Sequence, residues 1–310
     1  MTKKTHEKWA GRPITFCTAL ILGLVFWLCG TAWGEVSIVN SSTGHTTTAN
    51  STTANDPGTH GFKVFDGTLY KDKPDLSAYG LRNITIIYGE NFWKHKSEMN
   101  SLPHHIRVER LAREAASKSK VVCIDIENWP VHGDPDVVQD SIRKYAQVMQ
   151  WFRQAAPDAQ YGYYGVLPLG GYWPAIAPRT SPLRQAWEAD NAKMLPVAAT
   201  VNVVFPSLYT YYADPKAWVR FAIEQIHEAK KYGKPVYPFL WPQFHDSNHL
   251  LGGRYLPAAY WKLELDTVRA HADGVVIWGG WNLKHDRPAK WNNQAAWWQV
   301  TKKFLRQINN

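Results

Sequence analysis

The chain has 310 residues, of which 45% are hydrophobic, and its 35 Lys and Arg against 26 Asp and Glu give a formal net charge of +9. The positive charge is spread along the chain without a run of Lys or Arg, which argues against a nucleic-acid-binding module. Of three cysteines, Cys17 and Cys29 lie in the first 34 residues, so Cys123 has no partner for a disulfide in the rest of the chain.

The N-terminal residues 1–34 have the composition of a secretory signal peptide. Basic residues precede an apolar run at 19–28, and the small residues Ala32 and Gly34 follow it. The run is short for a membrane span, which needs about 20 apolar residues. We therefore expect cleavage and a secreted or periplasmic protein without a membrane span in the mature chain; a retained N-terminal anchor is the alternative. Residues 35–60 are rich in Ser, Thr, Asn and Gly and predict a flexible spacer.

Residues 61–310 alternate between short apolar strands and helical segments. Strands are predicted at 62–65, 84–88, 121–126, 160–164, 201–205, 236–240 and 275–278. Helices are predicted at 107–117, 137–155, 215–232, 257–272 and 292–308. This alternation predicts a single α/β domain, a TIM-like barrel rather than an open doubly wound sheet. No Gly-x-Gly-x-x-Gly motif follows the first strand, so no dinucleotide cofactor is expected.

The strand at 121–126 leads into two carboxylates, Asp125 and Glu127. Alternate residues of a strand share a face, so these two side chains should project together while Ile124 and Ile126 face the other way. Buried acids are costly unless something uses or satisfies them. In a parallel barrel, catalytic residues lie at the carboxyl ends of the strands. The alternative is a structural carboxylate that caps a loop or pairs with a nearby Lys or Arg.

Aromatic residues are unusually frequent, with 16 Trp and 15 Tyr. Most should fill the core, but Trp129, Trp241 and Trp278 stand at predicted strand ends, where flat apolar rings can pack against sugars. Trp129 and Trp241 each adjoin a proline and could instead anchor a loop. The histidines at 104–105 and 245–249 lie in predicted loops without a second set of ligands, so no metal site is expected.

Five blocks of sequence, in this order along the chain, resemble those of the hyaluronidases, glycoside hydrolase family 56. They are 125–130 (DIENWP), 161–168 (YGYYGVLP), 205–209 (FPSLY), 235–239 (PVYPF) and 274–281 (GVVIWGGW). The resemblance implies a distorted (β/α)7 barrel. It also implies substrate-assisted retaining catalysis without a cofactor, in which the acetamido oxygen of the sugar attacks its own anomeric carbon.

The resemblance also implies roles for individual residues. Glu127 would be the acid/base, and Asp125 would hold the acetamide N–H or raise the proton affinity of Glu127. The remaining assignments are to substrate contacts: Tyr209 to the acetamide, Tyr164 (or its neighbour Tyr163) to the sugar, and Trp278 to the acetamide methyl group. Glu90, which follows the second strand, is a further candidate for a substrate contact.

The function expected from these features is endo-acting hydrolysis of a polysaccharide that contains N-acetylhexosamine, by a monomeric protein. The mild positive charge is compatible with an anionic polymer. Two alternatives remain open: a retaining glycosidase with a carboxylate nucleophile and another specificity, and a non-catalytic polysaccharide-binding barrel.

Overall fold

Residues 61–282, 285 and 287–309 are described by a computed structural model. The predicted signal peptide at 1–34 and the predicted spacer at 35–60 lie outside these residues. In the part of the chain that is described, no helix combines the length and hydropathy needed to cross a bilayer.

Parallel strands form a ring in which neighbours follow one another along the chain. The strands are β1 (Lys63–Thr68), β2 (Arg82–Asn83), β3 (Thr85–Tyr88), β4 (Val121–Asp125), β5 (Gln160–Tyr163), β6 (Phe239–Leu240) and β7 (Gly274–Gly279). β2 and β3 are separated by Ile84 alone, and they pair with β1 and β4, respectively. β4 also pairs with β5, and β7 pairs with both β6 and β1.

Single parallel bridges connect β5 to β6 and complete the ring. The bridges join Tyr164 to Phe205, Val204 to Val236, and Ser207 to Phe239. The prediction of regular strands at 201–205 and 236–240 is therefore wrong, except for the two residues of β6. Pro206 and Pro238 explain the irregularity, because proline has no backbone N–H to donate to a ladder. The pairing nevertheless runs through seven strand positions, and the TIM-like α/β barrel is confirmed.

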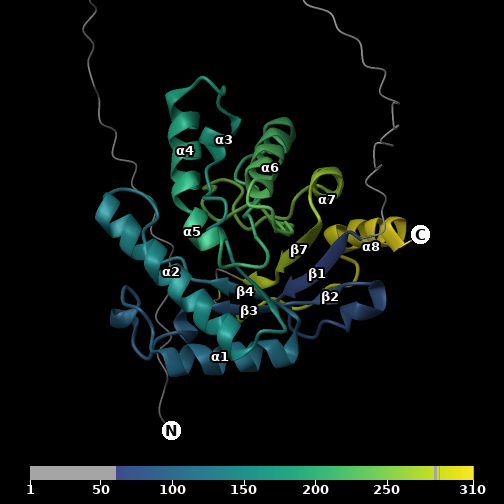
Figure 1. Ribbon diagram of the computed structural model, residues 1–310. Helices are drawn as coiled ribbons and strands as arrows, with labels where there is room; N and C mark the ends of the chain where they lie inside the picture. Colours follow the sequence, from purple (N-terminus) through teal and green to yellow (C-terminus); the bar gives the residue numbers. More distant parts are fainter. Residues whose placement is uncertain (1–60, 283–284, 286, 310) are drawn as a thin grey trace, which may run out of the picture. The chain divides into compact units, whose positions relative to one another are not determined.

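Helices lie around the outside of the strands (Figure 1). They are α1 (His105–Lys118), α2 (Pro135–Ala155), α3 (Tyr172–Ile176), α4 (Pro182–Lys193), α5 (Leu195–Ala198), α6 (Pro215–Lys230), α7 (Ala258–His271) and α8 (Ala296–Asn309). Shorter elements are the 3-10 helices η1 (Leu76–Tyr79), η2 (Gly89–Asn91) and η3 (Lys96–Glu98), and the antiparallel pair β8 (Trp281–Asn282) and β9 (Arg287–Pro288).

Local sequence explains where two of the long helices begin. Asp134 caps α2 by accepting a hydrogen bond from the Asp136 backbone at 2.9 Å, and Asp214 caps α6 through the Ala217 backbone at 3.0 Å. In both helices proline occupies the first position, where its missing N–H has no cost. The helices α3 to α5 were not predicted, because prolines divide residues 172–198 into pieces too short for a sustained helical period.

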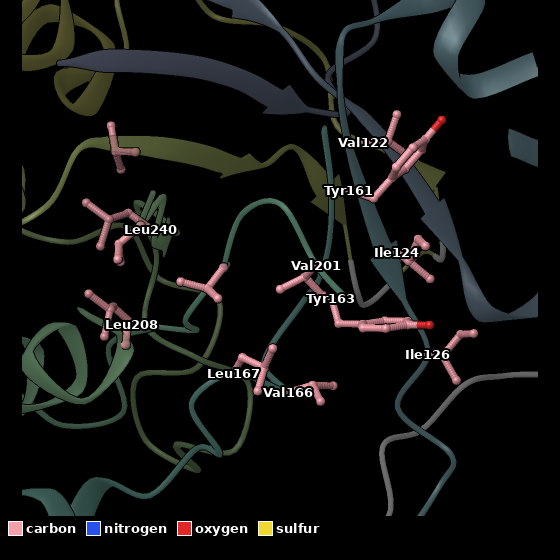
Figure 2. Close-up of a cluster of buried hydrophobic side chains, with 14 of the residues drawn as sticks. Val122, Ile124, Ile126, Tyr161, Tyr163, Val166, Leu167, Val201, Leu208 and Leu240 are labelled. Carbon is pink, nitrogen blue, oxygen red and sulfur yellow. The ribbon is translucent and has the colours of Figure 1, made fainter. Parts of the chain in front are cut away.

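Alternation along β4 divides its side chains between two clusters. Val121 and Cys123 point into the barrel, where they join Phe65, Phe205, Phe239 and Val276. Val122, Ile124 and Ile126 point outward to the helices, as Figure 2 shows along one side of the strand. Asp125, the last residue of β4, continues the inward set, and its charge interaction with Glu127 shows that the two acids lie close together.

Candidate active site

Hydrogen bonds hold the acidic strand end in place from two sides. The Tyr145 hydroxyl, from α2, donates to the carbonyl of Ile126 at 2.9 Å, between the two acids. Just beyond them, Asn128 and Trp129 both donate to the carbonyl of Met99, Trp129 at 3.0 Å. The backbone that carries both carboxylates is therefore tied to α2 on one side and to the loop before α1 on the other.

Both acids favour their protonated forms. Burial raises the pKa of Asp125 well above its usual range, and the negative charges of Glu127 and Glu90 raise it further. Desolvation by the protein atoms around its carboxylate also raises the pKa of Glu127, although the residue as a whole is exposed to solvent. Oδ1 of Asp125 is buried and has no hydrogen-bond partner among the described residues. The pair therefore binds a proton more tightly than isolated carboxyl groups do, and one of its own oxygens makes no hydrogen bond to a described residue.

An aromatic wall, defined here as Tyr209, Trp241 and Trp278, lies at the same end of the barrel. The ring centroid of Tyr209 lies 5.6 Å from that of Trp241 and 5.8 Å from that of Trp278. The ring centroids of the two tryptophans are 5.0 Å apart, and their ring planes make an angle of 82°. Trp241 is 3% exposed and donates to Gln243 at 3.0 Å, so it supports the other two rings from behind. Trp278 is more exposed and offers a face to a ligand.

Glycine at position 279 permits this packing. Its φ is +142°, in a region that other residues rarely adopt, and a Cβ there would lie 3.1 Å from the Trp241 ring. A side chain at position 279 would therefore disturb the packing of the wall.

Tyr164 belongs to the site, and its neighbour Tyr163 does not. The ring of Tyr164 lies 5.9 Å from that of Tyr209, and its hydroxyl is 2.9 Å from Oγ of Ser207. Tyr163 is fully buried on the outward side, where its hydroxyl donates to the Tyr145 carbonyl at 2.8 Å. The structure thus corrects the candidate role of Tyr163, because successive residues of a strand face opposite ways.

Trp129 is also a core residue rather than a wall of the cleft. It is 2% exposed and packs edge-to-face against Trp93 and Tyr145, at 5.8 and 4.9 Å. With its indole N–H bonded to Met99, it has no free face for a sugar, and the loop-anchor alternative is the correct one.

Glu90 follows β3 in η2 and is exposed at the same mouth. Its charge acts on Asp125 and on Tyr88, which places a third carboxylate close to Asp125 and Glu127.

Four polar or aromatic residues of the site were not anticipated from the sequence. Tyr88 pairs in register with Asp125, and its hydroxyl accepts a hydrogen bond from the Trp278 indole at 3.1 Å. Burial and the nearby acids raise its pKa to about 12, so it stays protonated. The others are Ser207, Tyr211 and His245. The one available signal was position: Tyr88 ends a predicted strand, as Asp125 does.

Tyr211 and His245 extend the aromatic surface. His245 stacks on Tyr209 at 5.9 Å and lies 4.8 Å from the Tyr211 ring. The sequence predicted only that His245 lies in a loop. Its contacts with Tyr209 and Tyr211 form because the segment after β6 folds back over the mouth of the barrel. Among the described residues no group of three or more His, Cys, Asp or Glu could hold a metal ion.

Comparison of the sequence with protein-family models and with curated proteins gives no match. Solved structures do match. The match to bee venom hyaluronidase spans 80% of this chain and 96% of the hyaluronidase chain, with a TM-score of 0.51 and 16% sequence identity. Its complex with a hyaluronic acid tetramer gives a TM-score of 0.53 at the same identity and coverage. An endo-β-1,4-mannanase from Thermotoga petrophila matches with a TM-score of 0.51 and 11% sequence identity. This match spans 80% of this chain and 70% of the mannanase chain.

The chain thus has the barrel fold found in glycoside hydrolases, with paired acids and an aromatic wall at the mouth. Within that class it resembles bee venom hyaluronidase, and at the level of the fold this confirms the resemblance inferred from the five sequence blocks.

Proposed function

We propose that the protein is a glycoside hydrolase that cleaves a polysaccharide containing N-acetylhexosamine, by endo-acting, substrate-assisted, retaining catalysis. The observation that carries the proposal is geometric: two neighbouring carboxyl groups, Asp125 and Glu127, lie beside an aromatic wall at the mouth of a barrel. Burial raises the pKa of both acids, which supports the same assignment. A cleft with convergent polar groups and perturbed acids is the arrangement expected of an active site.

Glu127 is the general acid in this proposal. It protonates the leaving oxygen and then, as carboxylate, takes a proton from the attacking water. Its raised pKa supports the first step, because a carboxylic acid must hold its proton at the working pH. Asp125 accepts the N–H of the acetamido group, which turns the acetamido oxygen toward the anomeric carbon.

The aromatic groups position the same sugar. Tyr209 has a raised pKa through burial and so keeps its hydroxyl proton for donation to the acetamide. Trp278, fixed by its hydrogen bond to Tyr88, presents an apolar face for the acetamido methyl group.

Replacing Glu127 tests the proposal directly. We expect Glu127→Gln to fold normally and to lose a factor of about 10² to 10⁴ in turnover, the usual contribution of general acid catalysis. Glu114→Gln removes the same charge from the outer surface of α1, where Glu114 pairs with Arg110 at 3.6 Å, and should be fully active. The assay is release of reducing ends from polymers that contain N-acetylhexosamine. A Glu127→Gln protein with wild-type turnover would refute the assignment.

Substrate assistance has its own test. A polymer stripped of its acetyl groups should resist cleavage, and a thiazoline analogue of the intermediate should inhibit. As pH rises through the raised pKa values of the pair, activity should fall, because the general acid loses its proton.

A retaining glycosidase with a carboxylate nucleophile is the second candidate. The third carboxylate at the mouth, Glu90, favours it, because two acids on opposite sides of a glycosidic bond are enough for that route. Trapping with a fluorinated sugar separates the two mechanisms, since a covalent adduct on Glu90 or Asp125 forms only by the second.

Export to the periplasm or the medium is proposed from the N-terminal sequence alone. Fractionation of cells that express the full chain, with N-terminal sequencing of the product, tests both export and cleavage.

A further inference from the structure

Exposed aromatic rings gather beside the candidate site. They form an outer platform, defined here as Tyr172, Trp173 and Tyr212. The ring centroid of Trp173 lies 5.2 Å from that of Tyr172 and 5.3 Å from that of Tyr212, and the centroids of the two tyrosines are 4.8 Å apart. Trp173 is 54% exposed and Tyr212 is 41% exposed. Clustered apolar side chains that stay open to solvent mark binding surfaces, whereas single exposed ones are ordinary.

The outer platform is held rigidly by the helices behind it. Tyr172 packs on the buried Phe221 of α6, with ring centroids 5.0 Å apart, and α3 lies beside α6 (Figure 1). Trp173 stands edge-on to Tyr172, with the ring planes at 85°. The carbonyl of Tyr212 accepts a hydrogen bond from the hydroxyl of Tyr260, on α7, at 3.2 Å. Because these rings are already fixed, little conformational entropy is lost when a ligand packs against them.

Tyr211 connects the outer platform to the candidate site. Its ring lies 6.3 Å from that of Tyr172 on one side and 4.8 Å from that of His245 on the other. His245 in turn stacks on Tyr209 of the aromatic wall at 5.9 Å. The charge of Glu127 acts on the Tyr211 hydroxyl, so Tyr211 also lies close to the acid pair. The wall and the platform are therefore two ends of one continuous series of rings.

The position of the outer platform indicates what binds to it. Its residues follow β5 and the irregular strand position at 201–205, so they lie at the carboxyl ends of the strands, as Asp125 does. The cleavage proposed above is internal, so the polymer must continue past the reacting sugar over this face of the barrel. Aromatic faces with hydroxyl groups at their edges suit the apolar faces and the hydroxyl groups of sugar rings.

We propose that Tyr172, Trp173 and Tyr212 form a distal subsite, which binds a sugar unit of the same polysaccharide away from the scissile bond, with the Trp173 ring stacked on the sugar. This inference rests on the proposed function for the class of ligand. It goes beyond that proposal, in which these three residues have no part, and it explains why the protein should bind long chains more tightly than short ones.

Replacing Trp173 tests the distal subsite. The ligands are the tetrasaccharide and decasaccharide of hyaluronan and the disaccharide and hexasaccharide of chitin, and calorimetry in the Glu127→Gln background keeps them intact. For at least one polymer we expect the longer ligand to bind more tightly than the shorter. Trp173→Ala should then raise the Kd of the longer ligand by a factor of about 3 to 10, the usual worth of one aromatic face contact, with a smaller effect on the shorter. If neither longer ligand binds, or if Trp173→Ala leaves the Kd unchanged, the distal subsite is refuted.

Three more variants locate the effect. Tyr212→Ala removes the second exposed ring and should weaken binding of the longer ligand independently, and Trp173→Phe, which keeps an apolar ring, should restore part of the affinity. Tyr79→Ala is the matched control. It removes a ring of similar exposure, 37%, from η1, where Tyr79 packs against Trp298 at 5.1 Å, and it should leave the Kd unchanged. Equal losses of affinity in Tyr79→Ala and Trp173→Ala would contradict a role specific to the outer platform.

Polymer cleavage separates the two proposals. If Trp173→Ala loses affinity for the longer ligand but the wild type releases no reducing ends from polymers that contain N-acetylhexosamine, the distal subsite stands and the hydrolase is refuted. If a polymer is cleaved and Trp173→Ala has the KM of the wild type, the hydrolase stands and the distal subsite is refuted. A dimer that Trp173→Ala dissociates in analytical ultracentrifugation, with sugar binding unchanged, would make the outer platform a contact between two copies of the chain and would also refute the distal subsite.

Discussion

The hydrogen bond from Tyr145 to the acidic strand end makes a sharp prediction. In Tyr145→Phe the ring should stay in place, because it packs edge-to-face against Trp129 and Tyr163, each at 4.9 Å. What is lost is the hydroxyl that donates at 2.9 Å to the carbonyl of Ile126, between Asp125 and Glu127.

The expected cost follows from the burial of this bond. Leaving a buried acceptor unpaired destabilises a protein by about 1–3 kcal/mol. For a domain of this size each kcal/mol lowers Tm by about 2–4 °C, so a decrease of about 2–12 °C is expected. The Ile126 peptide should also shift and move both acids. A displacement of about 1 Å costs up to about 10² in rate, so kcat should fall by a factor of about 10 to 100.

Tyr163→Phe is the matched control. Its hydroxyl makes a bond of the same kind, 2.8 Å to the carbonyl of Tyr145, one step further from the acids. It should show a similar fall in Tm with a nearly unchanged kcat. The measurements are thermal unfolding and initial rates of reducing-end release at saturating substrate. Wild-type kcat in Tyr145→Phe, or an equal loss of kcat in Tyr163→Phe, would refute the reasoning.

Three further predictions concern stability. The raised pKa of Asp125 makes the native wild-type protein hold a proton that the unfolded chain releases, so wild-type stability should fall as pH rises above the usual Asp range. Asp125→Asn has no proton to lose, so its Tm should rise relative to that of the wild type toward neutral pH, while its activity is lost. Gly279→Ala places a side chain at φ +142° against Trp241 and should cost about 1–3 kcal/mol in urea unfolding, with a change in tryptophan fluorescence; unaltered values would contradict the strained turn. Thr210→Val removes the 2.5 Å hydrogen bond to the fully buried Glu264 and should cost about 1–3 kcal/mol, whereas Thr210→Ser should restore most of it.

Local rules were enough to foresee much of the barrel. Apolar runs separated by capped helices identified most strands, and Asp134 and Asp214 marked their helix starts, because a cap depends on only a few neighbouring residues. The same rules failed at 201–205, where the prolines that follow interrupt the ladder, and at 172–198, where short helices pack on neighbours distant in sequence.

For the site, the sequence by itself determined the direction of the acid pair. A strand has a period of two, so Asp125 and Glu127 had to share a face opposite Ile124 and Ile126. Only the tertiary structure decided which aromatic residues join them. Tyr164 and Tyr163 are adjacent in sequence and so face opposite ways, but only the closure of the ring decides that Tyr164 points to the mouth and Tyr163 toward α2. Tyr88 enters from the end of β3, and Tyr211 and His245 enter from two different loops, because contact at a barrel mouth depends on how strands are arranged in space and not on distance along the chain.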